Sequence, residues 1–257
     1  MKYKYIDLEI RNCVGWFLFN RPPVNAVDWD MLDELGRAFR ELAEMRRVRV
    51  IVIASRLEEY FSAGADLSSF ANSSPRSMQE WVENTHELAT QIRGANQPIL
   101  AAIQGVAVGG GLEMSLHADL RFATHGARLG QPEINIAFLP PVAGTQALVR
   151  LVGRSAAFRI LYEGELIDAQ KALSIGLVDF LSEPGQLEAD VQGYAERLVE
   201  KPANALAAIR RCLVDGGGAT FDDGMKIERQ QANRLSGHPN FQIGVTSFLG
   251  KSKPRWT

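Results

Sequence analysis

The first hundred residues alternate between stretches with strand-like and helix-like hydrophobic patterns. Residues 5–10 and 14–19 have strand-like patterns, and the short polar segment between them predicts a β-hairpin. Asp28 is suited to cap a helix, because apolar side chains recur at helical spacing directly after it. The apolar positions of this predicted helix are Met31, Leu32, Leu35, Phe39 and Leu42.

Two further apolar runs have the length of buried strands. Residues 48–54 are rich in β-branched side chains, and residues 98–103 lead directly into a glycine-rich segment. Between these runs, a glycine-bearing loop at residues 61–66 is followed by a helical pattern over residues 81–92. The order strand, helix, strand, helix predicts an α/β core.

The pattern changes in the last third of the chain. Helical patterns cover residues 191–198, 204–214 and 225–235, and the segments KPAN and DGGGATFDDG separate them. No convincing strand-like run occurs in this part of the sequence. We therefore expect a core over residues 1–190 and a C-terminal helical region over residues 191–257.

Composition and charge narrow the class of protein. The 257 residues carry a net charge of −2, which gives no general attraction to nucleic acid or to an anionic membrane surface. Only two cysteines are present, Cys13 and Cys212, and they favour a reducing compartment over a disulfide framework. The N-terminus lacks the apolar block of a signal peptide, and no apolar run reaches membrane-spanning length. We expect a cytoplasmic protein without nucleic-acid or membrane partners.

The candidate chemistry lies in the glycine-rich segment. Three consecutive glycines at residues 109–111 come just before Glu113, and Glu133 follows twenty residues later. Glycines allow the backbone to approach a ligand closely and to turn sharply into a helix. Two carboxylates can together remove and add protons on the two sides of a bond. This pattern favours acid–base catalysis.

Other kinds of site fit the sequence poorly. Ser115, His117 and Asp119 lie two residues apart on a predicted helix and so point in different directions, which argues against a hydrolase triad. The four histidines are not grouped as metal ligands, so we expect no metal site. The segment GVAVGGG matches neither GxGxxG nor a P-loop, which argues against dinucleotide and nucleoside-triphosphate sites.

These motifs carry a family resemblance. The segments are NRPPVNAVDWDML, FSAGADL, QPILAAIQGVAVGGGLE, ADLRFATHGARLGQPE, PPVAGTQALVRLVG and DAQKALSIGLVD. In this order and spacing, the chain resembles the enoyl-CoA hydratase/isomerase (crotonase) superfamily over essentially its whole length. The resemblance implies a spiral of strand–strand–helix turns, and a C-terminal helical region that packs trimers, often as dimers of trimers. It also implies an acyl-coenzyme A substrate whose enolate is stabilised, with no metal or redox cofactor.

The resemblance assigns roles around the thioester. The N–H groups of Ala65 and Gly110 would form an oxyanion hole, which suits residues whose side chains offer no chemistry of their own. Glu113 and Glu133 would hold the water that adds to the double bond. Taken singly, each glutamate has an ordinary explanation: Glu113 would be stabilised at a helix N-terminus, and Glu133 could be a surface carboxylate after Pro132.

The resemblance also assigns residues to the coenzyme A moiety. Ala63, Asp66 and Leu67 would lie near the adenine. Lys251, in the basic tail SFLGKSKPRWT, would help to hold the phosphates, if necessary across a subunit boundary. The competing interpretation of this tail is a solvated, unengaged terminus.

One position departs from the family pattern. Pro141 stands where a glycine N–H usually helps to hold the catalytic water, and proline has no N–H. It also changes the wall of the acyl pocket. Hydration of a 2-enoyl-CoA is the function that the sequence favours. The alternatives are double-bond isomerisation or hydration of a dienoyl or cyclic enoyl-CoA, and a non-catalytic or RNA-binding relative is the least favoured.

Overall fold

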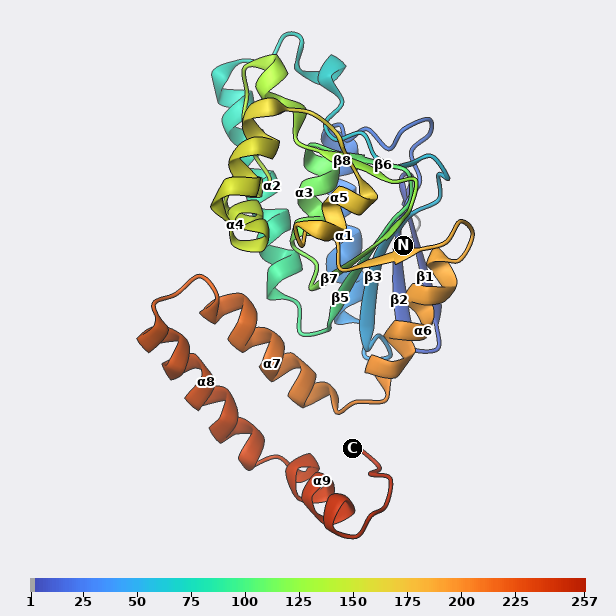
Figure 1. The fold of residues 1–257 in the computed structure, drawn as a ribbon, viewed down its shortest axis with the longest axis vertical. Coiled ribbons are helices and arrows are strands. Elements are labelled where there is room, and N and C mark those ends of the chain that lie inside the picture. Colours follow the sequence, from blue (N-terminus) through green and yellow to red (C-terminus); the bar gives the residue numbers. More distant parts are fainter. Residues whose placement is uncertain (1–2) are drawn as a thin grey trace.

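Six strands form the main sheet of the computed structural model, which describes residues 3–257 (Figure 1). The predicted hairpin forms its edge, with β1 antiparallel to β2, and every other neighbouring pair is parallel. In spatial order the strands are β1 (Ile6–Arg11), β2 (Val14–Phe19), β3 (Val50–Ser55), β5 (Ile99–Ile103), β7 (Leu120–Thr124) and β10 (Phe180–Ser182).

A smaller sheet lies beside it, and its strands are also arranged in the order in which they occur along the chain. Its strands are β4 (Tyr60–Ser62), β6 (Val106–Val108), β8 (Arg128–Gly130) and β9 (Ile167–Asp168). Each of β3, β5 and β7 is followed in the chain by one strand of this sheet and then by a helix. The chain therefore winds as a spiral of ββα turns, which confirms the fold class expected from the sequence.

Helices cover both faces of the main sheet. They are α1 (Trp29–Glu44), α2 (Pro75–Gly94), α3 (Gly110–Leu116), α4 (Gly144–Glu163), α5 (Ala169–Ser174) and α6 (Leu187–Val199), with short 3₁₀ helices η1 (Leu67–Phe70) and η2 (Pro132–Ile136). Asp28 caps α1 as predicted, since its carboxylate accepts from the N–H of Met31 at 2.9 Å.

Alternate side chains of the central strands enter two separate apolar clusters. Phe17 and Ile51 point into the large cluster with α1 and α2, whereas Trp16 and Val52 pack with Leu187, Val191 and Ala195 of α6 on the opposite face. A sheet buried on both faces explains the nearly uninterrupted apolar runs in the sequence. The division of the chain at residue 190 stays a prediction. In the structure, α6 belongs to the packed body, and the helices that leave it begin at α7.

The last three helices form an arm that projects from the body (Figure 1). They are α7 (Ala203–Gly216), α8 (Phe221–Ser236) and α9 (Pro239–Leu249). The sequence analysis missed α9, although His238 caps it and Pro239 begins it, which is a recognisable start signal. None of the helices within residues 3–257 combines the length and apolar composition that a membrane span requires.

Arg210 anchors this arm to the body. Its guanidinium is buried and donates to the carbonyl oxygens of Arg93 and Ala95, both at 2.6 Å, at the end of α2. It also donates to the carboxylate of Asp119 at 2.9 Å. One side chain thus satisfies the terminal carbonyls of α2 and fixes the start of the arm.

We predict that Arg210→Ala lowers the free energy of unfolding by about 3 kcal/mol, which corresponds to a melting temperature lower by roughly 10 °C. The reason is that the Asp119 carboxylate and the carbonyls at the end of α2 lose their donor. The matched control is Arg211→Ala. Arg211 forms only an exposed ion pair with Asp215, which is worth at most about 1 kcal/mol. Thermal unfolding of both variants checks this, and equal losses would contradict the anchoring role.

Candidate active site

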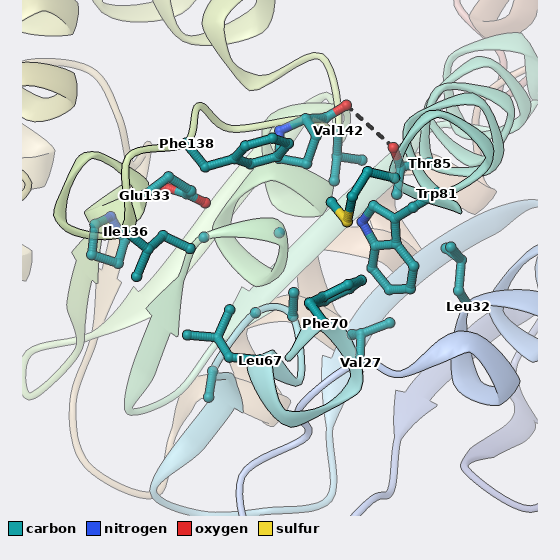
Figure 2. Close-up of a pocket in the computed structure, with 18 of the residues that line it drawn as sticks. Val27, Leu32, Leu67, Phe70, Trp81, Thr85, Glu133, Ile136, Phe138 and Val142 are labelled. Carbon is teal, nitrogen blue, oxygen red and sulfur yellow. Dashed lines mark hydrogen bonds between the residues drawn. The ribbon is translucent and has the colours of Figure 1, made fainter. Parts of the chain in front are cut away.

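A cavity of about 500 Å³ lies between α1, α2, the start of α3 and the segment after β8 (Figure 2). Its lining is mainly apolar, and Glu133 is the only charged residue that the described part of the chain contributes to it. Leu67 and Ile136 are about half exposed and mark the mouth, at 53% and 51%. Trp81 and Leu32 are buried and face Glu133 from the far side (Figure 2).

Two backbone N–H groups meet at this cavity without acceptors. Ala65 forms a parallel bridge with Val27, in which the bonds use Gly64 O and Asp66 N, both at 2.8 Å. The N–H of Ala65 consequently points away from Val27, and it has no acceptor among residues 3–257.

Gly110 supplies the second N–H as the first residue of α3, a helix without a side-chain cap. The two loops are in close contact: a Cβ on Gly64, whose φ is +79°, would lie 3.3 Å from the Gly110 nitrogen. The structure therefore places the loop of Ala65 beside the start of α3 at Gly110, and their role as an oxyanion hole stays a prediction.

Glu113 lies one turn into α3 and is completely buried. Its Oε1 accepts from the N–H of Gly144 at 2.8 Å, whereas its Oε2 has no hydrogen-bond partner among the residues that the structure describes. Burial, and secondarily the charge of Glu133, raise the pKa of Glu113 to about 8. A buried carboxyl oxygen without a partner in the protein indicates a group that acts on a bound ligand.

Glu133 lies in η2 and faces the cavity (Figure 2). Burial raises its pKa to about 7. Its Oε1 lies beside Gly109, where a Cβ would be only 2.8 Å away and where φ is +53°. The positive φ favours glycine there, and a Cβ would displace the Glu133 carboxylate. Gln131, with its amide nitrogen turned towards the carboxylate, donates to both oxygens of Glu133 at 3.1 and 3.3 Å.

The loop that contains Pro141 is held from three sides. The hydroxyl of Thr85 shares its one proton between the carbonyl of Val82 at 2.8 Å and that of Pro141 at 3.2 Å (Figure 2). His117 Nε2 donates to the carbonyl of Val142 at 2.7 Å. Glu113 holds the third side through Gly144. Burial lowers the pKa of His117 to about 4, so its ring is neutral at physiological pH.

The backbone of this loop is also unusual. Ala143 has a φ of +57°, a left-handed conformation that alanine adopts at a cost of about 1 kcal/mol or more. Such a conformation persists where the surroundings determine it, and the three hydrogen bonds to the loop do so. Pro141 therefore belongs to a fixed wall of the cavity.

Most of the expected site residues lie together, but three do not share the cavity surface. The cavity is lined by Ala63, Ala65, Leu67, Gly110, Glu133 and Pro141. Glu113 is next to this surface but is not part of it. Asp66 turns away to accept from Arg21 and from the hydroxyl of Ser68. Lys251 follows α9 in the projecting arm, so the expected contact with substrate does not form within one chain (Figure 1).

The sequence analysis missed several residues of the site. Trp81, Phe70 and Thr85 form its walls, and His117 supports its loop. The spacing of Trp81 and Thr85 on a predicted helix was visible, but only the fold shows that this helix faces Glu133. No cluster of three or more potential metal-binding His, Cys, Asp or Glu side chains occurs within residues 3–257.

The site has two neighbouring carboxyl groups with raised pKa values, and two unpaired N–H groups lie beside them at an apolar cavity. These features define an acid–base enzyme on a crotonase fold. Comparison of the sequence with known protein families supports this class of enzyme. The chain belongs to the enoyl-CoA hydratase/isomerase family, whose profile matches residues 9–257.

Relatives resemble the chain over nearly its full length. A crotonyl-CoA hydratase of Syntrophomonas wolfei is 31% identical, with 98% of both chains covered. A probable mitochondrial enoyl-CoA hydratase of Arabidopsis thaliana is 33% identical over 91% of this chain and 77% of that protein. Among solved structures, an enoyl-CoA hydratase from Bacillus anthracis superposes with a TM-score of 0.93 at 29% identity, covering 98% of this chain and 99% of that one.

The raised pKa values predict how stability depends on pH. The folded protein keeps protons on Glu113 and Glu133 that the unfolded chain loses above a pH of about 4.5, so the folded state is penalised as the pH rises to about 8. Glu133→Gln removes one of these groups. Its melting temperature should therefore increase relative to wild type between pH about 5 and about 8.

The control for this measurement is Glu58→Gln, a change at an exposed glutamate outside the cavity. Its difference in melting temperature from wild type should stay constant over the same range. A Glu133→Gln difference that is equally independent of pH would show that Glu133 titrates normally in the folded protein.

Proposed function

We propose that this protein is a hydratase that adds water across the C2–C3 double bond of a 2-enoyl-CoA thioester. The observation that carries the proposal is the neighbouring pair of Glu113, which is fully buried, and Glu133, which is partly buried, next to the free N–H groups of Ala65 and Gly110. The proposal is supported further by relatives described as crotonyl-CoA and enoyl-CoA hydratases.

The two N–H groups bind the thioester oxygen in this mechanism. When the hydroxyl oxygen adds to C3, electron density moves through C2 to the thioester oxygen and forms an enolate. Ala65 and Gly110 donate hydrogen bonds to that oxygen, and the N-terminal position of Gly110 in α3 adds a favourable dipole. Each donor of this kind contributes about 100- to 1000-fold to the rate.

The two carboxyl groups move the protons. Because they are close and buried, they titrate as a pair, and near neutral pH the pair holds one proton. The ionised carboxylate accepts a proton from the attacking water. The protonated carboxyl delivers a proton to C2, where the enolate collapses, so the pair ends with as many protons as it began with. The reaction therefore requires no metal or redox cofactor.

One observation favours isomerisation of the double bond as a second candidate. Val142 packs against the start of α3, with its Cγ2 3.6 Å from a Cβ position on Gly110, and Glu113 is not part of the cavity surface. Pro141 offers no N–H for a water. A single carboxylate, Glu133, can move a proton between C2 and C4 of a 3-enoyl-CoA without any water.

The C-terminal arm supports a symmetric oligomer. It exposes apolar side chains in helical register, which a single chain leaves uncovered: Phe221, Phe241, Val245, Phe248 and Leu249. An apolar hollow at α9 also contains Trp256 and Pro202. Patches of this kind mark protein–protein contacts, and equivalent patches on identical chains favour a closed ring. We therefore assign a trimer or a dimer of trimers, in which Lys251 reaches coenzyme A phosphates of a neighbouring subunit.

The remaining assignments follow from charge and chemistry. The net charge of −2 supports neither a nucleic-acid nor a membrane partner. Two cysteines without a disulfide fit a cytoplasmic enzyme. Its one required partner is the acyl-CoA substrate.

The central prediction for catalysis concerns Glu113→Gln and Glu133→Gln. Each should lower the kcat for crotonyl-CoA hydration by at least about 100-fold, because neither amide can exchange protons, while the Kd for butyryl-CoA should change by no more than about threefold. Loss of the enoyl-thioester absorbance measures turnover.

The same two variants separate the candidate reactions. If only Glu133→Gln loses activity, and a 3-enoyl-CoA is isomerised by Glu113→Gln at the wild-type rate, the enzyme works with one carboxylate. Near-normal hydration by either variant contradicts the two-carboxylate mechanism.

Light scattering checks the predicted assembly. The protein at micromolar concentration should have three or six times the mass of one chain. Phe248→Asp places a charge in the exposed apolar patch of the arm and should shift the population to smaller species. Tyr162→Asp, at an exposed aromatic residue of α4, is the matched control. A wild-type monomer would contradict the assignment.

A further inference from the structure

The cavity beyond the two glutamates has a blind end. Side chains of α1, α2 and α3 close it, and each of them is at most 5% exposed: Leu32, Leu35, Trp81, Leu88 and Met114. The mouth lies on the opposite side, at Leu67 and Ile136. A thioester held at Ala65 and Gly110 would place its coenzyme A towards the mouth, so the far end of its acyl group would enter this blind end (Figure 2).

Trp81 forms a fixed, flat wall of the blind end. Its ring packs edge-to-face against Trp29, at a centroid distance of 5.1 Å, and against Phe70 at 4.7 Å. These contacts hold the indole in one orientation. The wall formed by Pro141 and Val142 is also held in place, through Thr85 and His117. A cavity with two held walls favours a rigid ligand, which loses little conformational freedom on binding.

The blind end offers no partner for a charge. Among residues 3–257 no lysine or arginine lines the cavity, and the one charged residue that does, Glu133, is acidic. The hydroxyl of Thr85 is already engaged with the carbonyl of Pro141. The indole N–H of Trp81 is a donor at this wall, but no cation faces it, so a carboxylate at the end of the acyl group would be buried without a counter-charge, which is strongly unfavourable.

We infer that the substrate is an enoyl-CoA whose acyl group is an uncharged hydrocarbon with a ring at its far end, and that Trp81 is the residue that determines this specificity. The inference rests on the proposed function for the acyl-CoA itself. The ring lies against Trp81 in the blind end, and acyl groups that end in a carboxylate are excluded.

Binding of saturated acyl-CoA thioesters tests this without depending on turnover, because they have no double bond to hydrate. Calorimetry compares butyryl-CoA, hexanoyl-CoA, 3-phenylpropanoyl-CoA and adipyl-CoA. Each additional buried methylene strengthens binding about fourfold. On apolar area alone hexanoyl-CoA should therefore bind about 16-fold more tightly than butyryl-CoA. If the ring is recognised, the phenyl compound should bind at least about threefold more tightly than hexanoyl-CoA, and adipyl-CoA should bind at least about tenfold more weakly than hexanoyl-CoA.

Variants of Trp81 then assign the specificity. Trp81→Leu should weaken binding of 3-phenylpropanoyl-CoA about tenfold but that of butyryl-CoA no more than about twofold, because only the ring reaches this wall. Trp81→Phe, which keeps an aromatic wall, should retain most of the preference. The matched control is Tyr162→Leu, which removes an exposed aromatic ring outside the cavity and should leave all four affinities unchanged.

The outcomes distinguish the inference on substrate class from the proposed function on which it rests. Similar affinities for all four thioesters, or equal losses for both ligands in Trp81→Leu, overturn the inference on substrate class and leave the proposed hydratase standing. Failure of every acyl-CoA to bind overturns the proposed function and this inference together.

Discussion

The site depends on the burial of two carboxyl groups beside one another. Mainly apolar surroundings weaken the solvation of their charged forms, and the result is a raised pKa at both Glu113 and Glu133. Such an arrangement destabilises the folded protein at neutral pH. The surrounding elements therefore have to hold the two groups in place against their own repulsion.

The two carboxyl groups are held in place by short elements, and contacts from distant segments of the chain fix these elements. Helix α3 has only seven residues, and the buried Arg121 donates to the carbonyls of Ser115 and Ala118 at its end. The loop at Pro141 is fixed from α2 and α3 through Thr85 and His117. The same supports that hold the acid–base pair also fix the walls of the cavity, so proton transfer and acyl recognition share one scaffold.

Strands β1, β2, β3 and β5 and the Asp28 cap could be predicted, because local pattern determines them, whereas the remaining strands were not predicted. The shared role of Ala65 and Gly110 comes from motif resemblance and stays a prediction. What could not be predicted arises between distant segments. His117 meets Val142 across 25 residues, and Thr85 meets Pro141 across 56, and neither pairing leaves a local signal. The burial of Glu113 behind Val142 and the separation of Lys251 from the cavity likewise depend on tertiary packing.

The most direct test of the account follows the atoms of the reaction. Crotonyl-CoA is incubated with the enzyme in ¹⁸O-labelled D₂O, and the thioesters are analysed by mass spectrometry. Hydration by the carboxyl pair predicts a 3-hydroxybutyryl-CoA that carries one ¹⁸O at C3 and one deuterium at C2. Deuterium in the recovered enoyl-CoA without any ¹⁸O-labelled product would contradict it, because the site would then move protons but add no water.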